Sequence, residues 1–353
     1  MGITIKDIAK KCGVGVSTVS RALNNHPDIN SETKEKVLKI VAEYDFVPNN
    51  SARNLKRLDS KSIAILVEGI DNPFFSTMLR VMDPLIRKRG YDFLIEHIGK
   101  NQDDIEVALE QIAEKKVRGI VFLGGDFQNK TDKLAKISVP FVAVSAILPD
   151  DLKSLGTCVT IDDKKESCKM VSYLCQKGYK KIAILASDNR DTTIGKARLD
   201  GYLQALKENH VKEDKQLIQH LKGKDVAYSM QNGYLLTRKL LEKDADFDAL
   251  FAISDLMVIG AVKALLEAGK RIPVDVAVAG FDGLEYTKYF EPEITTMAQP
   301  TEDIAKESVE ALFEMIDTKE KVPGKILAAR LIKRKSTEGE NEDGKQIDRN
   351  SEK

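Results

Sequence analysis

The sequence predicts an α/β protein with a small helical head followed by a larger core of parallel β-sheets. Residues 3–23 have the apolar spacing of two short helices separated by a glycine. Residues 48–59 are mostly polar and can form about two helical turns. From Ser60 onward, apolar β-rich runs alternate with helical patterns, and this rhythm restarts after Asp162. Such alternation is typical of two lobes, each built on a parallel sheet.

The first helix is predicted to begin at Thr4, whose hydroxyl can cap it while Asp7 completes a capping box. Gly13 lies where this helix must stop and turn, a position that favours a residue without Cβ. A second helix is predicted to begin near Gly15–Val16. The two helices and the tight turn between them form a helix-turn-helix, whose second helix enters the major groove of DNA.

The outward face of this second helix carries Val16, Ser17, Thr18 and Arg21. Arg21 can form paired hydrogen bonds with a guanine or contact a phosphate. Ser17 and Thr18 can donate to a phosphate or a base edge, and Val16 can contact a thymine methyl group. The pattern alone leaves a second interpretation open, a helical hairpin with an ordinary polar surface.

The residues I-x-D-I-A-x-x-C-G-V-x-V-S-T-V-S-R-A-L-N, which begin at Ile5, closely resemble the DNA-binding head of the LacI/GalR family of bacterial transcription regulators. The resemblance continues through Pro48–Asn49 and covers nearly the whole chain. One departure is Gly15, where the family usually has a serine cap; glycine is weaker by a few tenths of a kcal/mol. The resemblance implies DNA contacts from Thr4, Val16, Ser17, Thr18, Arg21, Asn25, Asn49, Ala52 and Leu55.

The hinge, residues 48–59, resembles the family's hinge helix, which implies that it folds only on operator DNA beside a partner hinge. Leu55 matches the leucine that the family inserts into the minor groove, a wedge that kinks the duplex. Ala52 lets the hinge approach the groove floor. Composition alone also allows a flexible polar linker.

The head is predicted to span residues 1–47 and to close with a third helix. Ser31 is the expected cap of that helix. Its inner face is predicted to carry Val37, Ile40, Val41 and Tyr44. The core is predicted to span residues 60–335. The tail, residues 336–353, lacks an apolar stripe and is predicted to be disordered.

The two successive α/β lobes resemble a type I periplasmic-binding-protein fold, in which the chain crosses between lobes more than once. We expect an N-lobe of about 60–161 plus 292–324 and a C-lobe of about 162–291 plus 325–335. In this arrangement Thr295–Met297 returns to the first lobe, and the strand near Leu327–Ile332 to the second.

Ligands of parallel sheets bind beyond the carboxyl ends of the strands. Arg198 matches an R-x-x-G-[FY] arginine of the family and can hold two ligand oxygens; the alternative is a helix-surface ion pair with Asp200 or Glu208. Asp282, in a G-F-D-G sequence, can accept hydrogen bonds from sugar hydroxyls or form a turn. The effector-binding residues implied by the resemblance are Phe74, Phe75, Arg198, Tyr228, Ser254, Asp282 and Gln299.

The remaining positions of this set have weaker signals. Phe74 and Phe75 belong to an N-P-F-F segment and can stack on a ligand ring or simply pack the lobe. Tyr228 matches an aromatic residue that stacks on the effector in relatives. Ser254 is expected to face the ligand, and Asp255 to cap the following helix.

One departure bears on the effector. Many sugar-responsive members have an aspartate after the strand equivalent to residues 141–144, where this chain has Ser145-Ala146. A similar sequence occurs in the catabolite-control branch, whose co-repressor is a phosphorylated phosphocarrier protein. Glu291 stands where that branch would have an arginine. A phosphocarrier co-repressor therefore stays an alternative.

Composition narrows the function classes. The 353 residues have a formal net charge of +0, but residues 1–60 carry ten basic against seven acidic side chains, which is a modest basic footprint. No signal peptide, membrane span, nucleotide-binding motif or metal-ligand spacing is recognisable, and the four cysteines are expected to be reduced. An enzyme and a transport receptor are both disfavoured. We expect a cytoplasmic, homodimeric DNA-binding repressor that has no cofactor or metal. Its effector is expected to be a small molecule, namely a sugar or sugar derivative, and its operator is expected to be a near-palindrome.

Overall fold

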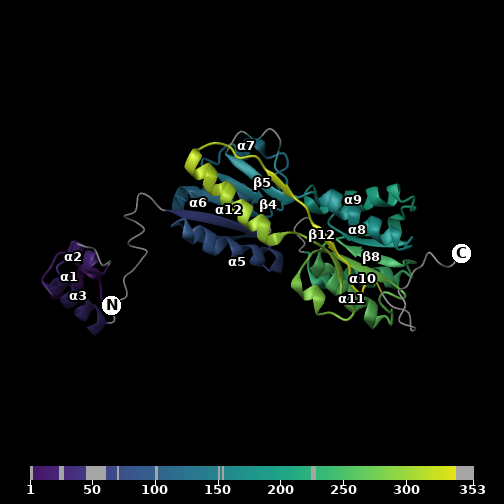
Figure 1. The fold of residues 1–353 in the computed structure, drawn as a ribbon, viewed down its shortest axis with the longest axis horizontal. Coiled ribbons are helices and arrows are strands. Elements are labelled where there is room, and N and C mark those ends of the chain that lie inside the picture. Colours follow the sequence, from purple (N-terminus) through teal and green to yellow (C-terminus); the bar gives the residue numbers. More distant parts are fainter. Residues whose placement is uncertain are drawn as a thin grey trace. The chain divides into compact units, whose positions relative to one another are not determined.

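The computed structural model describes residues 3–23, 28–44, 61–69, 71–99, 102–149, 152, 155–223 and 228–338. The chain divides into two compact units, residues 1–60 and 61–353. Each unit is described separately below (Figure 1). Every helix in the described part of the chain is too short or too polar to cross a membrane.

The head contains α1 (Ile5–Cys12), α2 (Val16–Leu23) and α3 (Ser31–Glu43). The predicted capping box of Thr4 and Asp7 is present, and Gly13 ends α1 at φ 68°. The cap of α3 is Asn30 rather than Ser31, because the Asn30 side chain accepts a hydrogen bond from the Glu32 amide and Ser31 is already helical. The buried core of the head consists of Ile8, Ala9, Cys12, Val19, Ala22 and Val37.

The third helix departs from the prediction at its end. Ile40 and Val41 are partly buried against this core, but Tyr44 is 40% exposed. Its hydroxyl accepts a hydrogen bond from Lys11 Nζ at 3.0 Å, and the Lys11 ammonium lies 4.2 Å from the centre of the Tyr44 ring. Tyr44 therefore joins α3 to α1 at the surface rather than in the core.

The first lobe of the larger unit is built on a six-stranded sheet in the order β11-β5-β4-β3-β1-β2, with all pairs parallel. Its strands are β1 (Ser62–Glu68), β2 (Asp92–Ile98), β3 (Gly119–Leu123), β4 (Phe141–Val144), β5 (Gly156–Ile161) and β11 (Lys325–Leu327). Its helices are α5 (Pro73–Lys88), α6 (Asp104–Lys115), the short α7 (Thr131–Leu134) and α12 (Thr301–Thr318).

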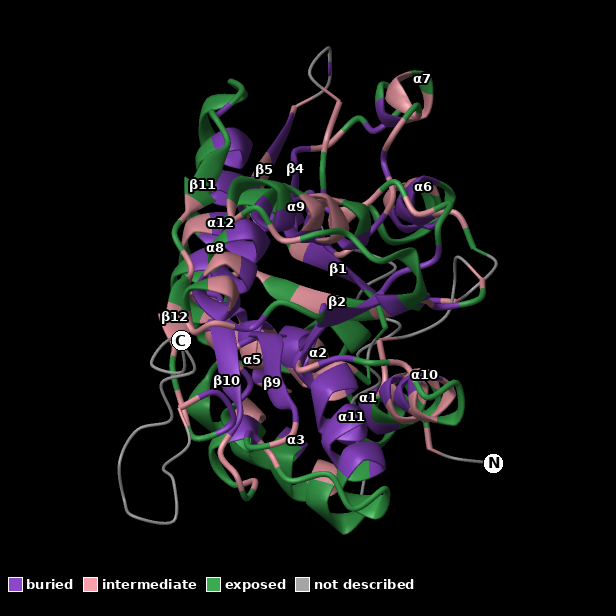
Figure 2. Ribbon diagram, turned by 90° about the vertical axis from the view of Figure 1, so that its right-hand side faces the viewer, coloured by how far each residue is buried: buried purple, intermediate pink, exposed green. Residues whose placement is uncertain are grey.

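Alternation along β1 explains why this sheet is covered on both faces. Ile63 and Ile65 belong to the cluster that contains Met78 and Met82 of α5. Ala64 and Leu66 belong to a separate cluster with Ile105 of α6. Successive strand residues point to opposite faces, so a strand that is apolar throughout must be buried on both. In Figure 2 the inner strand β1 is drawn as buried, whereas its neighbour β2 at the edge of the sheet is largely exposed or intermediate.

The second lobe repeats this plan in the order β12-β10-β9-β8-β6-β7, with β12 antiparallel. Its strands are β6 (Ile182–Ala186), β7 (Ile218–His220), β8 (Ala249–Ala252), β9 (Ala277–Asp282), β10 (Thr295–Ala298) and β12 (Arg330–Ile332). Its helices are α8 (Asp163–Gln176), α9 (Ile194–Glu208), α10 (Met230–Glu242) and α11 (Asp255–Glu267). The helices pack in two pairs, α8 with α9 and α10 with α11 (Figure 1).

The predicted lobe boundaries are wrong at two places. Thr295–Met297 lies in β10, which pairs with β9 and so stays in the second lobe; α12 is the element that returns to the first. The return to the second lobe occurs only after β11, because residues 325–327 pair with β5 of the first sheet and only β12 joins the second sheet. A strand of three or four residues carries no sequence signal for which sheet edge it joins.

The start of the tail also differs from the prediction. Ser336 and Thr337 are buried, and the Ser336 hydroxyl donates to the Val278 carbonyl while accepting from the Thr295 amide. Residues 336–338 therefore belong to the second lobe. Residues 339–353 lie outside the described part of the chain.

Candidate functional site

The outer face of α2 is accessible at the positions that the sequence predicts. Val16 is 41% exposed, Ser17 and Arg21 are exposed, and Thr18 is half-buried. Val19 and Ala22 are buried, and they fix the orientation of the helix. The first turn and the one long cationic side chain of α2 are thus presented together, as reading the major groove requires.

Thr4, which is also a predicted DNA contact, is the N-cap of α1. Its hydroxyl donates to Asp7 Oδ2 at 2.6 Å and accepts from the Asp7 amide at 3.4 Å. The hydrogen bond from Thr4 lowers the pKa of the exposed Asp7 carboxyl. The proposed DNA contacts at Asn25, Asn49, Ala52 and Leu55 fall outside the described residues and remain predictions.

In the core, Arg198 of α9 is the centre of a buried polar network. It is 2% exposed, and its Nε donates to Asp163 Oδ1 at 2.8 Å. Its Nη1 donates to the Ile253 carbonyl at 2.6 Å and to Asp282 Oδ1 at 3.3 Å. The guanidinium carbon lies 3.9 Å from the centre of the Phe281 ring. Arg198 thus joins the start of α8 to the carboxyl ends of β8 and β9.

The alternative interpretation of Arg198, a surface ion pair, is wrong. Asp200 pairs with Lys196, and Glu208 accepts a hydrogen bond from Gln204 at 2.7 Å. The arginine instead lies on the buried side of α9.

Asp282 ends β9 with a φ of 114°, which is unusual for a residue with a side chain. Its Oδ1 accepts from Arg198 and from Gln299 Nε2, the latter at 3.0 Å. Burial raises the pKa of Asp282 to about 6, although the Arg198 charge opposes this shift. The predicted residues Arg198, Asp282 and Gln299 are therefore in direct contact.

The predicted cap of α11 is wrong, because Ser254 rather than Asp255 caps this helix. Ser254 is the cap of α11, and its Oγ accepts from the Met257 amide at 3.3 Å. Asp255 is fully buried and accepts from the Gly283 and Leu284 amides at 2.8 and 2.7 Å. Burial raises the pKa of Asp255 well above its usual value. Asp255 thus holds the turn after β9, which positions Asp282.

Tyr228 lies in a second group at the carboxyl end of β6. Its hydroxyl donates to Asp191 Oδ2 at 3.4 Å. A Cβ on Gly195 would lie 2.3 Å from the Tyr228 hydroxyl and 2.6 Å from the Ser187 Cβ, so glycine permits this close approach. Burial raises the pKa of Tyr228 above the usual value of a tyrosine, so the phenol stays protonated at neutral pH.

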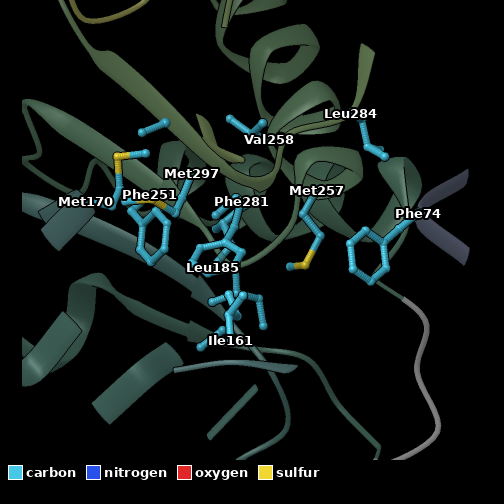
Figure 3. Packing of buried hydrophobic residues seen from close by; sticks show 14 of the residues in the cluster. Phe74, Ile161, Met170, Leu185, Phe251, Met257, Val258, Phe281, Leu284 and Met297 are labelled. Atoms are coloured by element: carbon cyan, nitrogen blue, oxygen red, sulfur yellow. The ribbon is translucent and has the colours of Figure 1, made fainter. Parts of the chain in front are cut away.

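Phe74 and Phe75, at the start of α5, are 4% and 8% exposed and contact each other edge to face at 5.3 Å. Both belong to the main apolar cluster. In Figure 3 the Phe74 ring lies on the same side as Met257 and Leu284 of the second lobe. These rings pack the core, and any contact with a ligand stays a prediction.

Sequence reasoning missed Asp163, Ser187 and Asp191, which lie beside the predicted residues Arg198 and Tyr228. Asp163 follows β5, and Ser187 follows β6, so the rule that strand ends form ligand sites could have found both. The hydroxyls of Ser145 and Ser187 are buried and have no hydrogen-bond partner in the described part of the chain.

The two lobes also meet directly. The Thr192 hydroxyl of the second lobe lies 3.4 Å from Asp126 Oδ2 of the first. Within the described ranges, no three His, Cys, Asp or Glu side chains are placed to hold a metal ion.

Two family models match this sequence. Residues 4–49 match the lacI family of bacterial regulatory proteins, and residues 171–337 match the periplasmic binding protein-like domain. The HTH-type transcriptional regulator MalR of Clostridium butyricum is 40% identical over 337 residues, which are 95% of this chain and 99% of that protein. The ribose operon repressor of Haemophilus influenzae is 30% identical over 318 residues, which are 89% of this chain and 92% of that protein.

Solved structures resemble the whole chain. A complex of the transcriptional regulator CelR with cellobiose has 27% sequence identity and a TM-score of 0.70, covering 95% of this chain and 99% of that one. The lac repressor dimer bound to operator and the anti-inducer ONPF has a TM-score of 0.74 at 22% identity, and the match covers 96% of this chain and 99% of that one. The latter shows a shared fold.

Asp282→Asn tests the buried carboxyl. Because the folded state raises the pKa of Asp282 to about 6 from 3.8, the folded protein binds more protons than the unfolded one between these values. Asp282 therefore favours folding less as pH rises through 6. Relative to the variant, the wild type should lose about 1 kcal/mol of unfolding free energy between pH 5 and pH 7. Urea denaturation at both pH values measures this, and a constant difference would contradict it.

Proposed function

The chain belongs to the lacI family of bacterial regulatory proteins, and from this premise we propose that it is a homodimeric repressor controlled by a sugar. As a family member it is a DNA-binding transcription regulator. The proposal concerns the direction of regulation, the effector and the residues involved. It also places the protein in the cytoplasm, where a repressor meets its DNA.

The observation that carries the effector proposal is the buried contact of Arg198, Asp282 and Gln299 at the strand ends. Asp282 can accept hydrogen bonds from hydroxyl groups, while Gln299 and Arg198 hold it in place. The unpartnered hydroxyls of Ser145 and Ser187 can donate or accept. Such mixed donors and acceptors suit a ligand with several hydroxyl groups.

Local charge favours an uncharged sugar over a phosphorylated one. The Arg198 guanidinium is already paired with Asp163 and Asp282, and the Arg190 guanidinium after β6 is paired with Asp188. Asp126 and Asp191 add further negative charge. A phosphate group would be repelled, whereas hydroxyls would be accepted. Relatives whose names mention a sugar include the ribose operon repressor and the cellobiose complex of CelR.

A phosphocarrier co-repressor is the second candidate. It is favoured by Ser145-Ala146, which replaces the aspartate of many sugar-responsive members. Glu291 counts against it, because this exposed acidic side chain pairs with Lys335. The sugar proposal is therefore preferred.

Ser187→Ala tests the sugar proposal. Since the Ser187 hydroxyl has no hydrogen-bond partner among the described residues, its removal should leave the unfolding free energy unchanged or slightly higher. Sugar affinity should fall about five- to tenfold. A panel of neutral mono- and disaccharides is screened by thermal shift, and affinities are measured by calorimetry. Thr157→Val is the matched control, because it removes another unpartnered buried hydroxyl, near the amino end of β5. Equal affinities in both variants would exclude Ser187 from the site.

Arg21→Ala tests recognition by α2. The operator is first identified by selecting random duplex DNA with the purified protein, and a near-palindromic site is expected. The variant should lose about 10- to 100-fold in specific affinity while retaining much of its non-specific binding. Lys39→Ala is the control, since it removes one exposed positive charge from α3. If competition assays give the same specificity ratio for Arg21→Ala and wild type, Arg21 does not read bases.

Leu55→Ala tests the hinge. A leucine wedge unstacks a base step and bends the duplex, so its removal should reduce the bend angle of the operator complex. Energy transfer between dyes at the two ends of the operator measures this angle. An unchanged angle at saturating protein would refute the wedge.

A further inference from the structure

A groove on the second lobe lies away from the strand ends. Its volume is about 620 Å³, and it is lined by residues of α8, α9 and β12 together with their flanking residues. We call it the lysine groove. Its lining residues are Asp162, Lys164, Lys165, Cys168, Lys169, Ser172, Tyr173, Gln176, Gln204, Glu208, Leu331 and Lys333.

The lysine groove has an excess of positive charge. Lys169 pairs with Glu166 at 2.7 Å, but among the described residues no carboxylate lies within ion-pair distance of the ammonium groups of Lys164, Lys165 or Lys333. Four lysines line the groove against two acidic residues: Asp162, which accepts from the Lys165 amide, and Glu208, which accepts from Gln204. The groove can therefore accept an acidic occupant.

The chain itself arrives at this groove. Thr337 is buried, and its hydroxyl shares a 3.0 Å hydrogen bond with the hydroxyl of Tyr173, which lines the groove. The Lys333 ammonium lies 5.1 Å from the centre of the Tyr173 ring. Glu338 acts electrostatically on Tyr173. The last described residues are thus fixed at one end of the groove.

The sequence that follows is acidic. After Glu338 come Gly339, Glu340, Asn341, Glu342 and Asp343, with three carboxylates in four residues from Glu340 to Asp343. An extended chain advances about 3.4 Å per residue, so this segment covers about 7 to 17 Å from Glu338.

The spacing of lysines along α8 matches this reach. Tyr173, Lys169 and Lys165 are four residues apart and share one face of the helix. At 1.5 Å per residue, Lys169 lies about 6 Å and Lys165 about 12 Å along the axis from Tyr173. Carboxylates that lie about 7 to 17 Å along the chain from Glu338 can therefore contact both Lys169 and Lys165.

We propose that the segment Glu340–Asp343 docks in the lysine groove of its own chain. Each exposed ion pair contributes little, but the covalent link from Thr337 gives the segment an effective concentration in the millimolar range. The docked state is consequently sensitive to salt, and an acidic polypeptide in solution competes with it poorly. The proposal is independent of the sugar site.

Zero-length carbodiimide crosslinking of the full chain, followed by mass spectrometry, tests this proposal. We expect amide links from Glu340, Glu342 or Asp343 to Lys165, Lys169 or Lys333 at low salt. They should become rare at about 1 M salt, where the Debye length is about 3 Å. Lys239 and Lys243 of the second lobe serve as reference lysines outside the groove. Links spread evenly over all these lysines, or no links, would overturn the proposal.

Charge reversal separates docking from mere proximity. Lys165→Glu together with Lys333→Glu should reduce the yield of links to Lys169 about fivefold or more, since two favourable pairs are lost. Adding Glu340→Lys and Glu342→Lys should restore links between the segment and the groove. A mixture of isotopically light and heavy protein distinguishes links within one chain from links between chains. Predominantly mixed-isotope links would mean that the segment covers the groove of a second copy, and the proposal would fail.

Discussion

The buried ion pair between Arg198 and Asp163 is the constraint on which the second lobe and its proposed ligand site depend. Through this pair and the hydrogen bonds to Ile253 and Asp282, one side chain connects three chain segments far apart in sequence. Removing one partner of a buried pair typically costs about 3–5 kcal/mol, because the other charge is left unpaired. The geometry of the strand ends is therefore set before any ligand arrives.

Local signals in the sequence predicted the elements well. The Thr4–Asp7 capping box, the turn at Gly13 and the apolar β-rich runs after Ser60 each depend on neighbouring residues, and the structure confirms them. Features that depend on contacts between residues far apart in the sequence were harder to predict. Asp163 was missed because its partner is 35 residues away, and β10 was assigned to the wrong lobe because its sheet is chosen by the open edge of β9.

The proposed site shows the same division between local and distant signals. Arg198, Asp282 and Gln299 were predicted from their sequence motifs and do lie together. The choice of Ser254 rather than Asp255 as the cap of α11 was not predictable, because either side chain can cap a helix. What decides it is the position of the Gly283 and Leu284 amides, which only the folded loop after β9 brings to Asp255.

The order of segments in the two lobes has a consequence for synthesis on the ribosome. The first lobe contains residues 61–161 but also needs α12 and β11, which end at residue 327. The whole of β6 to β10 is translated between these parts. A nascent chain therefore carries an incomplete first lobe, with the apolar surface that α12 will cover still open, while the second lobe is being made. Such surfaces are aggregation-prone, so the first lobe stays exposed to aggregation until α12 and β11 have been made.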